Sequence, residues 1–152
     1  MTAAETATAA PAATQCVDTD VEAIRRLTHE YSWAVDNARL DDIVALFTED
    51  AEWDVTAFGM DTVRGSDALR AFYAGLIENT THRCHLALNH RIDVNGDSAA
   101  ATVYIHAFVT MPDGRRDESL GYYSDSYVRT GQGWKFQRRA AYPLLPAPPA
   151  PV

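Results

Sequence analysis

The chain has 152 residues, of which 47% are hydrophobic and 10% aromatic, enough for a single domain with its own core. Its formal net charge of −8 argues against binding to nucleic acid, because phosphate contacts depend on clustered Lys and Arg. No apolar run approaches the roughly 18 residues of a membrane span, and no signal peptide is evident. We therefore expect a soluble cytoplasmic protein without a nucleic-acid or membrane partner.

The two ends of the chain differ in composition from the middle. Residues 1–17 are rich in Ala and Thr and have almost no large apolar side chains, so we expect them to be disordered. Residues 143–152 contain five of the seven prolines and should form an extended tail. The folded domain is predicted to cover residues 18–142. Cys16 falls in the N-terminal tail and Cys84 in a predicted strand, so both are expected to be reduced thiols.

A long amphipathic helix is predicted first. Thr19 and Glu22 form a capping-box pattern that begins the helix near residue 20. Apolar side chains then recur at helical spacing as far as about Ala38. This stripe consists of Val21, Ile24, Leu27, Tyr31 and Val35. We expect it to be the buried side of the helix.

Two shorter helices and a strand are predicted next. Asp41 and Asp42 supply the negative charge that favours the N-terminus of a second helix. The apolar residues of this helix are Ile43, Leu46 and Phe47. A short strand is expected around residues 51–55. Ser66 can cap a third helix, whose buried side should contain Leu69, Phe72, Tyr73, Leu76 and Ile77.

Four strands are predicted after residue 80. The first two, residues 82–94 and 98–111, flank Asn95-Gly96, a dipeptide typical of two-residue hairpins in which both turn positions need positive φ. Asp113-Gly114 precedes a third strand at residues 117–129, and a glycine-rich turn precedes a fourth at residues 134–142. Helices followed by an antiparallel meander indicate an α+β fold with the helices on one face of a bent sheet.

His85 is the first candidate for acid–base chemistry, since histidine titrates nearest to neutral pH. Side chains of equal parity share one face of a strand, so His85, Ala87 and Asn89 should point the same way. The small side chain of Ala87 would leave room for a ligand above the imidazole and the amide. Spacing alone leaves open whether His85 acts on a ligand or is a structural histidine.

Asp36 is a second candidate because its predicted position in a helix is unfavourable for a negative charge. It lies near the C-terminal end of the first predicted helix, where a negative charge is unfavourable by about 0.3–1 kcal/mol. By helical angle it shares a polar face with His29 and Ser32 and could simply be solvated. Tyr31 lies five residues earlier, roughly 140° around the helix. Periodicity alone therefore does not combine Asp36 and Tyr31 into one site.

Metal, nucleotide and nucleophilic chemistry receive little support. His85 and His106 could approach each other across the hairpin, but no third ligand, Cys pair or H-E-x-x-H motif is evident. The chain also lacks the G-x-S-x-G nucleophile elbow and the glycine-rich phosphate loops. Aromatic side chains are plentiful, and buried tyrosines need hydrogen-bond partners. Several of them around a cavity would suit a ring-bearing ligand.

Five segments of the sequence carry a recognisable pattern. They are Y-S-W-A-V-D (31–36), L-F-T-E-D-A-E-W (46–53), V-R-G-S-D-A-L (63–69), H-L-A-L-N-H-R-I-D-V-N-G-D-S-A (85–99) and G-W-K-F (133–136). Together they resemble the SnoaL-like domains of the NTF2-like superfamily, over essentially all of residues 18–142. The resemblance implies a cone-shaped α+β barrel in which three N-terminal helices pack on a strongly bent, mainly antiparallel sheet.

The resemblance also implies a catalytic site, most similar in pattern to those of bile-acid 7α-dehydratase, scytalone dehydratase and lindane dehydrochlorinase. In that group an Asp on the first helix pairs with a His on the first long strand, which here correspond to Asp36 and His85. His85 would be the general base, Asp36 would orient it, and Tyr31 would donate a hydrogen bond or a proton. No metal or cofactor is implied. Substrate-binding side chains are expected among Asn89, His106, Trp53, Phe58, Phe72, Tyr123, Tyr127 and Arg138.

Several activities are compatible with this resemblance. The first hypothesis is a cofactor-independent lyase or isomerase that dehydrates a polycyclic or polyketide/steroid-like carbonyl compound. A polyketide cyclase or a ketosteroid-type isomerase would use the same base, and a non-catalytic small-molecule-binding or dimerisation module is a further alternative. An epoxide hydrolase is not favoured, because no Asp-Arg-Asp arrangement is evident. The resemblance also implies a homo-oligomer, a dimer or trimer, with contacts through the outer face of the sheet.

Overall fold

The computed structural model describes residues 12–144, with side chains from Thr19 onward. Of the tails predicted at the two ends, residues 1–11 and 145–152 lie outside the described residues. The helices are α1 Ala12–Asp36, α2 Leu40–Ala45 and α3 Ser66–Glu78, with a 3-10 turn η1 at Thr56–Phe58. The strands are β1 Phe47–Asp54, β2 Val63–Arg64, β3 His82–Asn95, β4 Ser98–Thr110, β5 Arg116–Thr130 and β6 Gly133–Pro143.

Helix α1 is longer than predicted. It begins at Ala12 rather than near residue 20, so residues 12–17 are helical where we expected disorder. This segment contains Ala and Gln, which are good helix formers, and it continues a helix that is already formed from residue 18 onward. Within the described part of the chain, none of the helices combines the length and the apolarity needed to cross a membrane.

The C-terminal end of α1 is sharply defined. Ala38 has a φ of 56°, and its N–H donates to the carbonyl oxygen of Val35 at 3.2 Å. The N–H of Arg39 donates to the carbonyl oxygen of Ala34 at 2.9 Å. These two bonds form the Schellman pattern, which satisfies carbonyl groups that a helix end leaves free. The cap fixes the last turn of α1 and therefore the position of Asp36.

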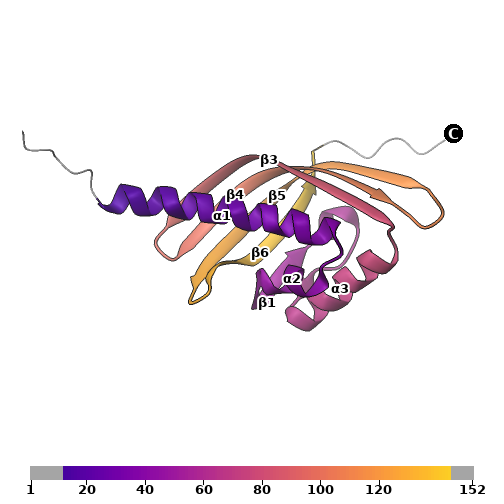
Figure 1. The fold of residues 1–152 in the computed structure, drawn as a ribbon, viewed down its shortest axis with the longest axis horizontal. Helices are drawn as coiled ribbons and strands as arrows, with labels where there is room; N and C mark the ends of the chain where they lie inside the picture. The colour runs from indigo at the N-terminus through magenta and orange to yellow at the C-terminus, as the bar shows by residue number, and fades with distance from the viewer. Residues whose placement is uncertain (1–11, 145–152) are drawn as a thin grey trace, which may run out of the picture.

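Helix α1 lies lengthwise along the sheet, against β3 (Figure 1). Ile24, Leu27, Tyr31 and Val35 of the predicted stripe are all buried, as expected from their spacing. The shorter helices α2 and α3 gather near the C-terminal end of α1 (Figure 1). Helix α2 contacts both α1 and α3 and so lies between them at this end of the fold.

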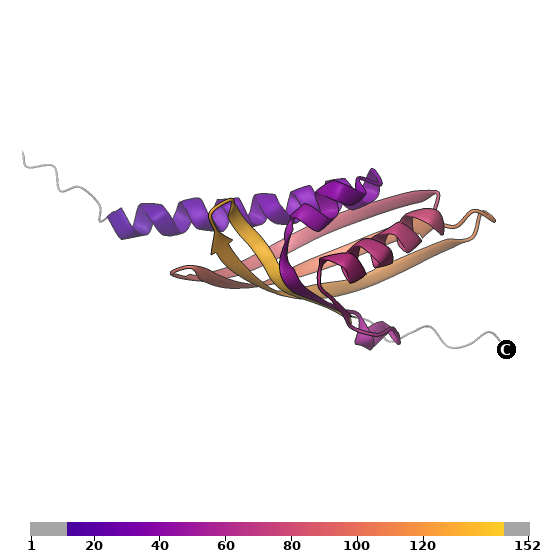
Figure 2. The same cartoon turned by 90° about the horizontal axis from the view of Figure 1, so that it is seen from below.

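The six strands form one sheet in the order β2-β1-β6-β5-β4-β3. Strands β1 and β6 are parallel, and all other neighbours are antiparallel. Figure 2 shows β1 and β6 turning away from β3 and β4, so the sheet is strongly bent. The predicted α+β fold, with three helices on a bent and mainly antiparallel sheet, is confirmed. The sheet does not close into a complete barrel, since the edge strands β2 and β3 do not pair in the described residues.

The hairpin between β3 and β4 turns one residue later than predicted. Asn95 pairs with Ser98, so the two turn residues are Gly96 and Asp97. Gly96 has a φ of 61°, whereas Asn95 and Asp97 have no positive φ. A glycine with positive φ in the first turn position is the type II′ arrangement, which needs no positive φ in the second position. The expectation that Asn95 and Gly96 form the turn is corrected accordingly.

Two other boundaries differ from the sequence-based expectations. The N-cap of α3 is Gly65, and Ser66 makes no cap, because its Oγ donates instead to the carbonyl oxygen of Glu49 at 3.4 Å. Strand β1 begins at Phe47, well before the strand expected at residues 51–55. Phe47 is paired with Phe136 of β6, a distant partner that the local sequence pattern does not reveal.

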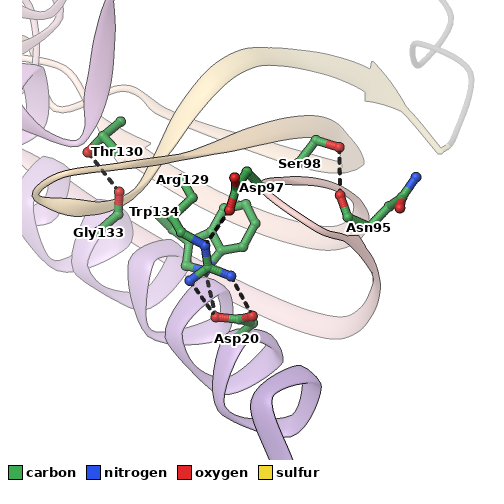
Figure 3. A network of polar contacts seen from close by, with 8 residues as sticks. All are labelled: Asp20, Asn95, Asp97, Ser98, Arg129, Thr130, Gly133 and Trp134. Atoms are coloured by element: carbon green, nitrogen blue, oxygen red, sulfur yellow. Dashed lines mark hydrogen bonds and ion pairs between the residues drawn. The ribbon is translucent and has the colours of Figure 1, made fainter. Parts of the chain in front are cut away.

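A polar cluster anchors the N-terminal half of α1 to the two hairpins (Figure 3). Arg129 donates to both carboxylate oxygens of Asp20, at 2.9 and 2.6 Å, and Trp134 Nε1 donates to the same carboxylate at 3.1 Å. Nε of Arg129 also donates to Asp97 at 2.9 Å. The hydrogen bond from Arg129 is the main reason why the pKa of Asp20 is lowered. The cluster ties α1 to the β3–β4 turn and to the β5–β6 hairpin.

Candidate active site

His85 and Asp36 form a hydrogen-bonded pair between β3 and α1. Nδ1 of His85 lies 2.7 Å from Oδ1 of Asp36, and the backbone N–H of His85 donates to Oδ2 at 2.9 Å. The two side chains are 11% and 22% exposed, so the pair is shielded from water without being sealed off. With Nδ1 facing a carboxylate, a neutral imidazole keeps its proton on Nδ1 and its lone pair on Nε2. This is the geometry of a base held by an orienting carboxylate.

Arg83 binds the C-terminal end of α1, next to Asp36 in the sequence. Its Nε donates to the carbonyl oxygen of Val35 at 2.9 Å, and its Nη1 donates to the carbonyl oxygen of Thr80 at 2.9 Å. The guanidinium therefore lies at the C-terminal end of α1, where a positive charge interacts favourably with the helix dipole. It links α1 to the start of β3.

A cavity of about 500 Å³ lies beside the His85–Asp36 pair, with His85 in its wall. Its apolar side chains include Trp53, Val55, Phe58, Phe72, Leu76 and Ile105. In the described part of the chain, no Lys or Arg side chain lines it. Apolar walls with a few polar groups are typical of a site for a small organic molecule.

Three buried tyrosines, Tyr31, Tyr73 and Tyr123, also line the cavity. The hydroxyls of Tyr31 and Tyr73 are hydrogen-bonded at 2.9 Å. The ring of Tyr31 makes edge contacts with those of His85 and Tyr123, at centroid distances of 6.5 and 6.2 Å. Burial raises the pKa of Tyr31 and raises the pKa values of Tyr73 and Tyr123 further. All three phenols therefore stay protonated near neutral pH and are able to donate hydrogen bonds.

A fully buried ion pair lies behind these tyrosines. Arg139 donates to the two carboxylate oxygens of Asp125 at 2.8 and 2.7 Å, and both side chains are 0% exposed. The guanidinium carbon lies 4.3 Å from the ring centre of Tyr31 and 4.0 Å from that of Tyr123. Burial by itself would lower the pKa of Arg139, but Asp125 more than reverses this effect and keeps it positive. The positively charged guanidinium of Arg139 therefore lies in a fixed position against the rings of Tyr31 and Tyr123.

Four of the predicted substrate-binding residues line the cavity. They are Trp53, Phe58, Phe72 and Tyr123. Trp53 packs edge-on against Phe72 and Tyr123, at centroid distances of 6.5 and 5.7 Å. Phe58 is 42% exposed, which places it where the cavity meets solvent. The cavity thus joins aromatic rings from β1, η1, α3 and β5.

Two predicted binding residues, Asn89 and His106, do not line the cavity. A register shift between Leu88 and Arg91 interrupts the alternation of β3, and Asn89 within it has a φ of 51°. The expectation that Asn89 shares the face of His85 is therefore not met. His106 is paired with Leu86, on the opposite face of the sheet from His85. His85 and His106 do not converge, and the described residues contain no group of three potential metal ligands.

Tyr127 and Arg138 also lie away from the cavity. Tyr127 is buried, and its hydroxyl donates to Oδ2 of Asp125 at 2.7 Å. Arg138 donates to Glu52 at 3.1 Å and to Asp54 at 2.7 Å, which ties β6 to β1. Both side chains are engaged in contacts that support the fold.

Sequence reasoning did not single out Arg83, Asp125 and Arg139, and it treated Tyr73 only as part of a buried helix face. The hydrogen bond between Tyr31 and Tyr73 spans 42 residues and depends on how α1 and α3 are placed. Asp125 and Arg139 are register partners in the β5–β6 hairpin. Alignment of the two predicted strands across their turn would have placed the acidic Asp125 opposite the basic Arg139. The sequence therefore contained a signal for this ion pair.

Comparison with known proteins agrees with this architecture. A model of the SnoaL-like domain matches residues 19–140. Three curated proteins, one from Mycobacterium bovis and two from strains of Mycobacterium tuberculosis, are each 31% identical over 122 residues. Each alignment covers 76% of this chain and 80% of the relative. All three relatives are named as uncharacterised proteins.

Solved structures are similar over most of their length. A "putative aromatic ring hydroxylase" from Novosphingobium aromaticivorans is 30% identical, with a TM-score of 0.83 over 85% of this chain and 92% of that one. A "putative scytalone dehydratase" from the same species is 26% identical, with a TM-score of 0.81 over 87% and 89%. A hexachlorocyclohexane dehydrochlorinase shares the fold at 18% identity, with a TM-score of 0.72 over 92% and 91%. With its family match over residues 19–140, the chain belongs to the SnoaL-like domain family and has the fold of the NTF2-like superfamily.

Proposed function

We propose that this protein is a cofactor-independent lyase that removes water from a polycyclic or polyketide/steroid-like carbonyl compound. The observation that carries the proposal is the His85–Asp36 pair beside the cavity, which leaves Nε2 of His85 for a ligand. A solved structure at 26% identity that is named as a "putative scytalone dehydratase" is consistent with elimination chemistry.

In the proposed reaction, Nε2 of His85 accepts the proton from a carbon next to a carbonyl group. The electron pair of the broken C–H bond forms an enolate. Collapse of the enolate makes a carbon–carbon double bond as the β-hydroxyl group leaves. The proton held by His85 returns to the departing hydroxide, so that water is the second product. Asp36 stabilises the imidazolium between these steps, and Tyr31 donates a hydrogen bond to the enolate oxygen.

The cavity supports an uncharged ring compound as the substrate. Its volume of about 500 Å³ is within the range of small-molecule sites. Edge-on aromatic rings such as Trp53 and Tyr123 suit flat hydrocarbon surfaces. A carboxylate or phosphate group would find no Lys or Arg among the described lining residues. The same base and cavity would also serve the cyclase and isomerase alternatives, which share an enolate intermediate.

An unfilled cavity also supports an enzyme over a binding or dimerisation module. In a module without catalytic function, we would expect large aromatic side chains to fill the interior. Here Phe58, Phe72 and Trp53 form walls around open space, and a hydrogen-bonded His–Asp pair stands at one side of it.

Deuterium exchange tests the proposal without knowledge of the natural substrate. The protein is incubated in D₂O with a panel of bicyclic ketones and β-hydroxy ketones, and mass spectrometry follows deuterium uptake and loss of water. We expect wild-type protein to accelerate both and His85→Gln to slow them by about 10²–10⁴-fold. His82→Gln is a matched control, because His82 is exposed on the same strand.

Three outcomes separate the candidates. Exchange followed by loss of water supports the dehydratase. Exchange without loss of water, for β-hydroxy ketones that exchange well, supports the cyclase or isomerase. No exchange with any ketone of the panel, or exchange that is unchanged in His85→Gln, would contradict His85 as a catalytic base.

A further inference from the structure

Arg83 makes three hydrogen bonds at the end of the fold that holds the His85–Asp36 pair. Its Nε donates to the carbonyl oxygen of Val35 at 2.9 Å, and its Nη1 donates to the carbonyl oxygen and to Oγ1 of Thr80 at 2.9 and 2.6 Å. All three acceptors are uncharged oxygen atoms. The guanidinium therefore joins two segments, the end of α1 and the residues that follow α3, to the strand β3 that carries it.

We propose that Arg83 is a positioning residue, whose contacts in two directions fix the last turn of α1 and so the position of Asp36 against His85. The proposal rests on the proposed function for its effect on catalysis. Its effect on the geometry of the pair has a readout of its own, which needs no substrate. Arg83 acts through the pair, because it is not among the described residues that line the cavity.

Two separate contacts join α1 to β3 at this point. The first is made by the carboxylate of Asp36, which binds the backbone N–H and the ring of His85. The second is made by the guanidinium of Arg83, which binds the carbonyl oxygen of Val35. The two residues on β3 share one face of the strand, about 7 Å apart. A single contact would leave the helix end free to turn about it, and the second contact removes that freedom.

Thr80 receives the other arm of Arg83 and also belongs to the cavity wall. It is 8% exposed, and its Oγ1 donates to the carbonyl oxygen of Leu76 in the last turn of α3 at 2.6 Å. The hydroxyl thus donates to α3 and accepts from Arg83, which fixes its orientation. Leu76 lines the cavity as well. The contacts of Arg83 therefore hold the cavity wall and the turn of Asp36 together.

Lysine in place of Arg83 tests whether the contact in two directions matters. An ammonium group keeps the positive charge but lacks the planar fork with which a guanidinium donates to two separate acceptors. We expect Arg83→Lys to slow ketone exchange by about 10²-fold, since a displacement of about 1 Å in a catalytic group has effects of that size. The KM for the ketone should stay within about 2-fold, because a positioning residue acts on the chemical step.

The readout without substrate is the Nδ1 proton of His85 in ¹H NMR. A proton held between an imidazole and a carboxylate at 2.7 Å resonates far downfield and exchanges slowly with water. In Arg83→Lys this resonance should move upfield or broaden by exchange. Arg129→Lys is the matched control, because Arg129 also bridges α1 to a strand but binds Asp20 in the N-terminal half of the helix (Figure 3). Its resonance should match that of wild-type protein.

Thr80→Val tests the second arm. Valine has the shape of threonine without the hydroxyl, so that Nη1 of Arg83 keeps only the carbonyl oxygen as an acceptor. The loss of exchange should be smaller than in Arg83→Lys. The Arg83→Lys/Thr80→Val double variant should lose less than the product of the two single losses, because both changes break the same contact. Thermal unfolding confirms that each variant is folded before it is compared.

The outcomes separate a positioning role from general support of the fold. An unchanged Nδ1 resonance in Arg83→Lys, or equal changes in Arg83→Lys and Arg129→Lys, would overturn the proposal. Wild-type exchange by Arg83→Lys would overturn it too. If Arg83→Lys does not fold, the resonance in Thr80→Val decides in the same way. If wild-type protein exchanges no ketone, the proposed function fails, whereas a resonance that changes in Arg83→Lys and not in Arg129→Lys still supports Arg83 as the residue that positions the pair.

Discussion

Asp36 binds His85 twice, through the ring Nδ1 at 2.7 Å and through the backbone N–H at 2.9 Å. The backbone bond fixes the carboxylate relative to β3, and the ring bond then fixes the imidazole relative to the carboxylate. The Schellman cap at Ala38 and the contact from Arg83 to Val35 hold the same turn of α1. The imidazole of His85 is therefore oriented by the junction of α1 with β3 rather than by its own strand alone.

Asp36→Asn should inactivate the base while leaving its position almost unchanged. An amide oxygen can still accept the backbone N–H of His85, but the NH₂ group then faces Nδ1. Nδ1 must accept a hydrogen bond, so the imidazole proton moves to Nε2, the atom that has to take the substrate proton. We expect ketone exchange to fall nearly as far as in His85→Gln, and ¹⁵N NMR of the imidazole to report the change of tautomer.

Asp41→Asn is the control for this change. Asp41 forms an exposed ion pair with Arg70, and exposed pairs contribute about 0–1 kcal/mol to stability. The Asp41→Asn variant should therefore exchange ketone protons at the wild-type rate. A wild-type rate in Asp36→Asn, with the tautomer altered, would show that proton abstraction does not depend on Nε2.

Removal of one partner of the Asp125–Arg139 ion pair should destabilise the protein strongly. Replacement of both partners by apolar residues should destabilise it much less. Arg139→Met alone leaves the Asp125 carboxylate buried without its partner, which typically costs about 3–5 kcal/mol. Replacement of both residues, Asp125→Leu with Arg139→Met, removes both charges and should recover most of that loss. Urea unfolding of the single and double variants measures the difference. Equal stabilities in the single and the double variant would contradict this account.

Much of the fold follows from local patterns in the sequence. The spacing of Ile24, Leu27, Tyr31 and Val35 predicted the buried side of α1. Turn residues predicted the four long strands in order, although the β3–β4 turn lies one residue later than expected. One boundary that differs, the start of β1, has a nonlocal cause. Strand β1 begins at Phe47 because β6 pairs with it in parallel. No local feature of residues 47–50 predicts that Phe47 pairs with Phe136.

The candidate site was only partly accessible from the sequence. Helical angle placed Asp36 on a polar face, and only the family resemblance paired it with His85. The pairing crosses 49 residues and depends on the angle at which α1 crosses β3. Strand parity failed at Asn89 because the irregularity between Leu88 and Arg91 changes which way the side chains point. The alternation of hydrophobic and polar residues does not predict where such a register shift occurs.

The exposed face of the sheet supports the expectation of a homo-oligomer. We propose that a second copy of the chain covers an apolar sheet face on β3, β4 and β5, where side chains that are 38–48% exposed lie on neighbouring strands. This apolar sheet face consists of Leu86, Leu88, Tyr104, Phe108 and Leu120. Contiguous exposed apolar surface of this kind marks interaction sites in proteins.

The double variant Leu88→Asp/Phe108→Asp should separate the two copies, because it would bury two unpaired carboxylates in the contact. Sedimentation velocity is expected to show a dimer for wild-type protein and a monomer for the variant. Trp33→Asp is the matched control, since Trp33 is 63% exposed on α1 and lies off the apolar sheet face. Wild-type protein that sediments as a monomer, or a double variant that stays dimeric, would count against the proposal.

His90 should make the protein less stable in mild acid. It packs edge-on against His29 at 5.4 Å, and its Nε2 is buried without a hydrogen-bond partner in the described part of the chain. Burial lowers the pKa of His90, and the charges of His29, Arg25 and Arg139 lower it further, while Asp125 acts in the opposite direction. The native state therefore binds a proton at this position less readily than the unfolded chain does.

The sign of the effect follows from that difference. Above the unfolded pKa of about 6.5, the ring is neutral in both states and has no influence on the pH dependence. As the pH falls below that value, the unfolded state takes up the proton first, so the free energy of unfolding decreases until the native ring is also protonated. His90→Gln removes this loss. In urea unfolding between about pH 7 and pH 5, the variant should lose less stability than wild-type protein, whereas His82→Gln should follow the wild-type curve because His82 is exposed. Parallel curves for wild-type protein and His90→Gln would show that acid acts on the stability through another group.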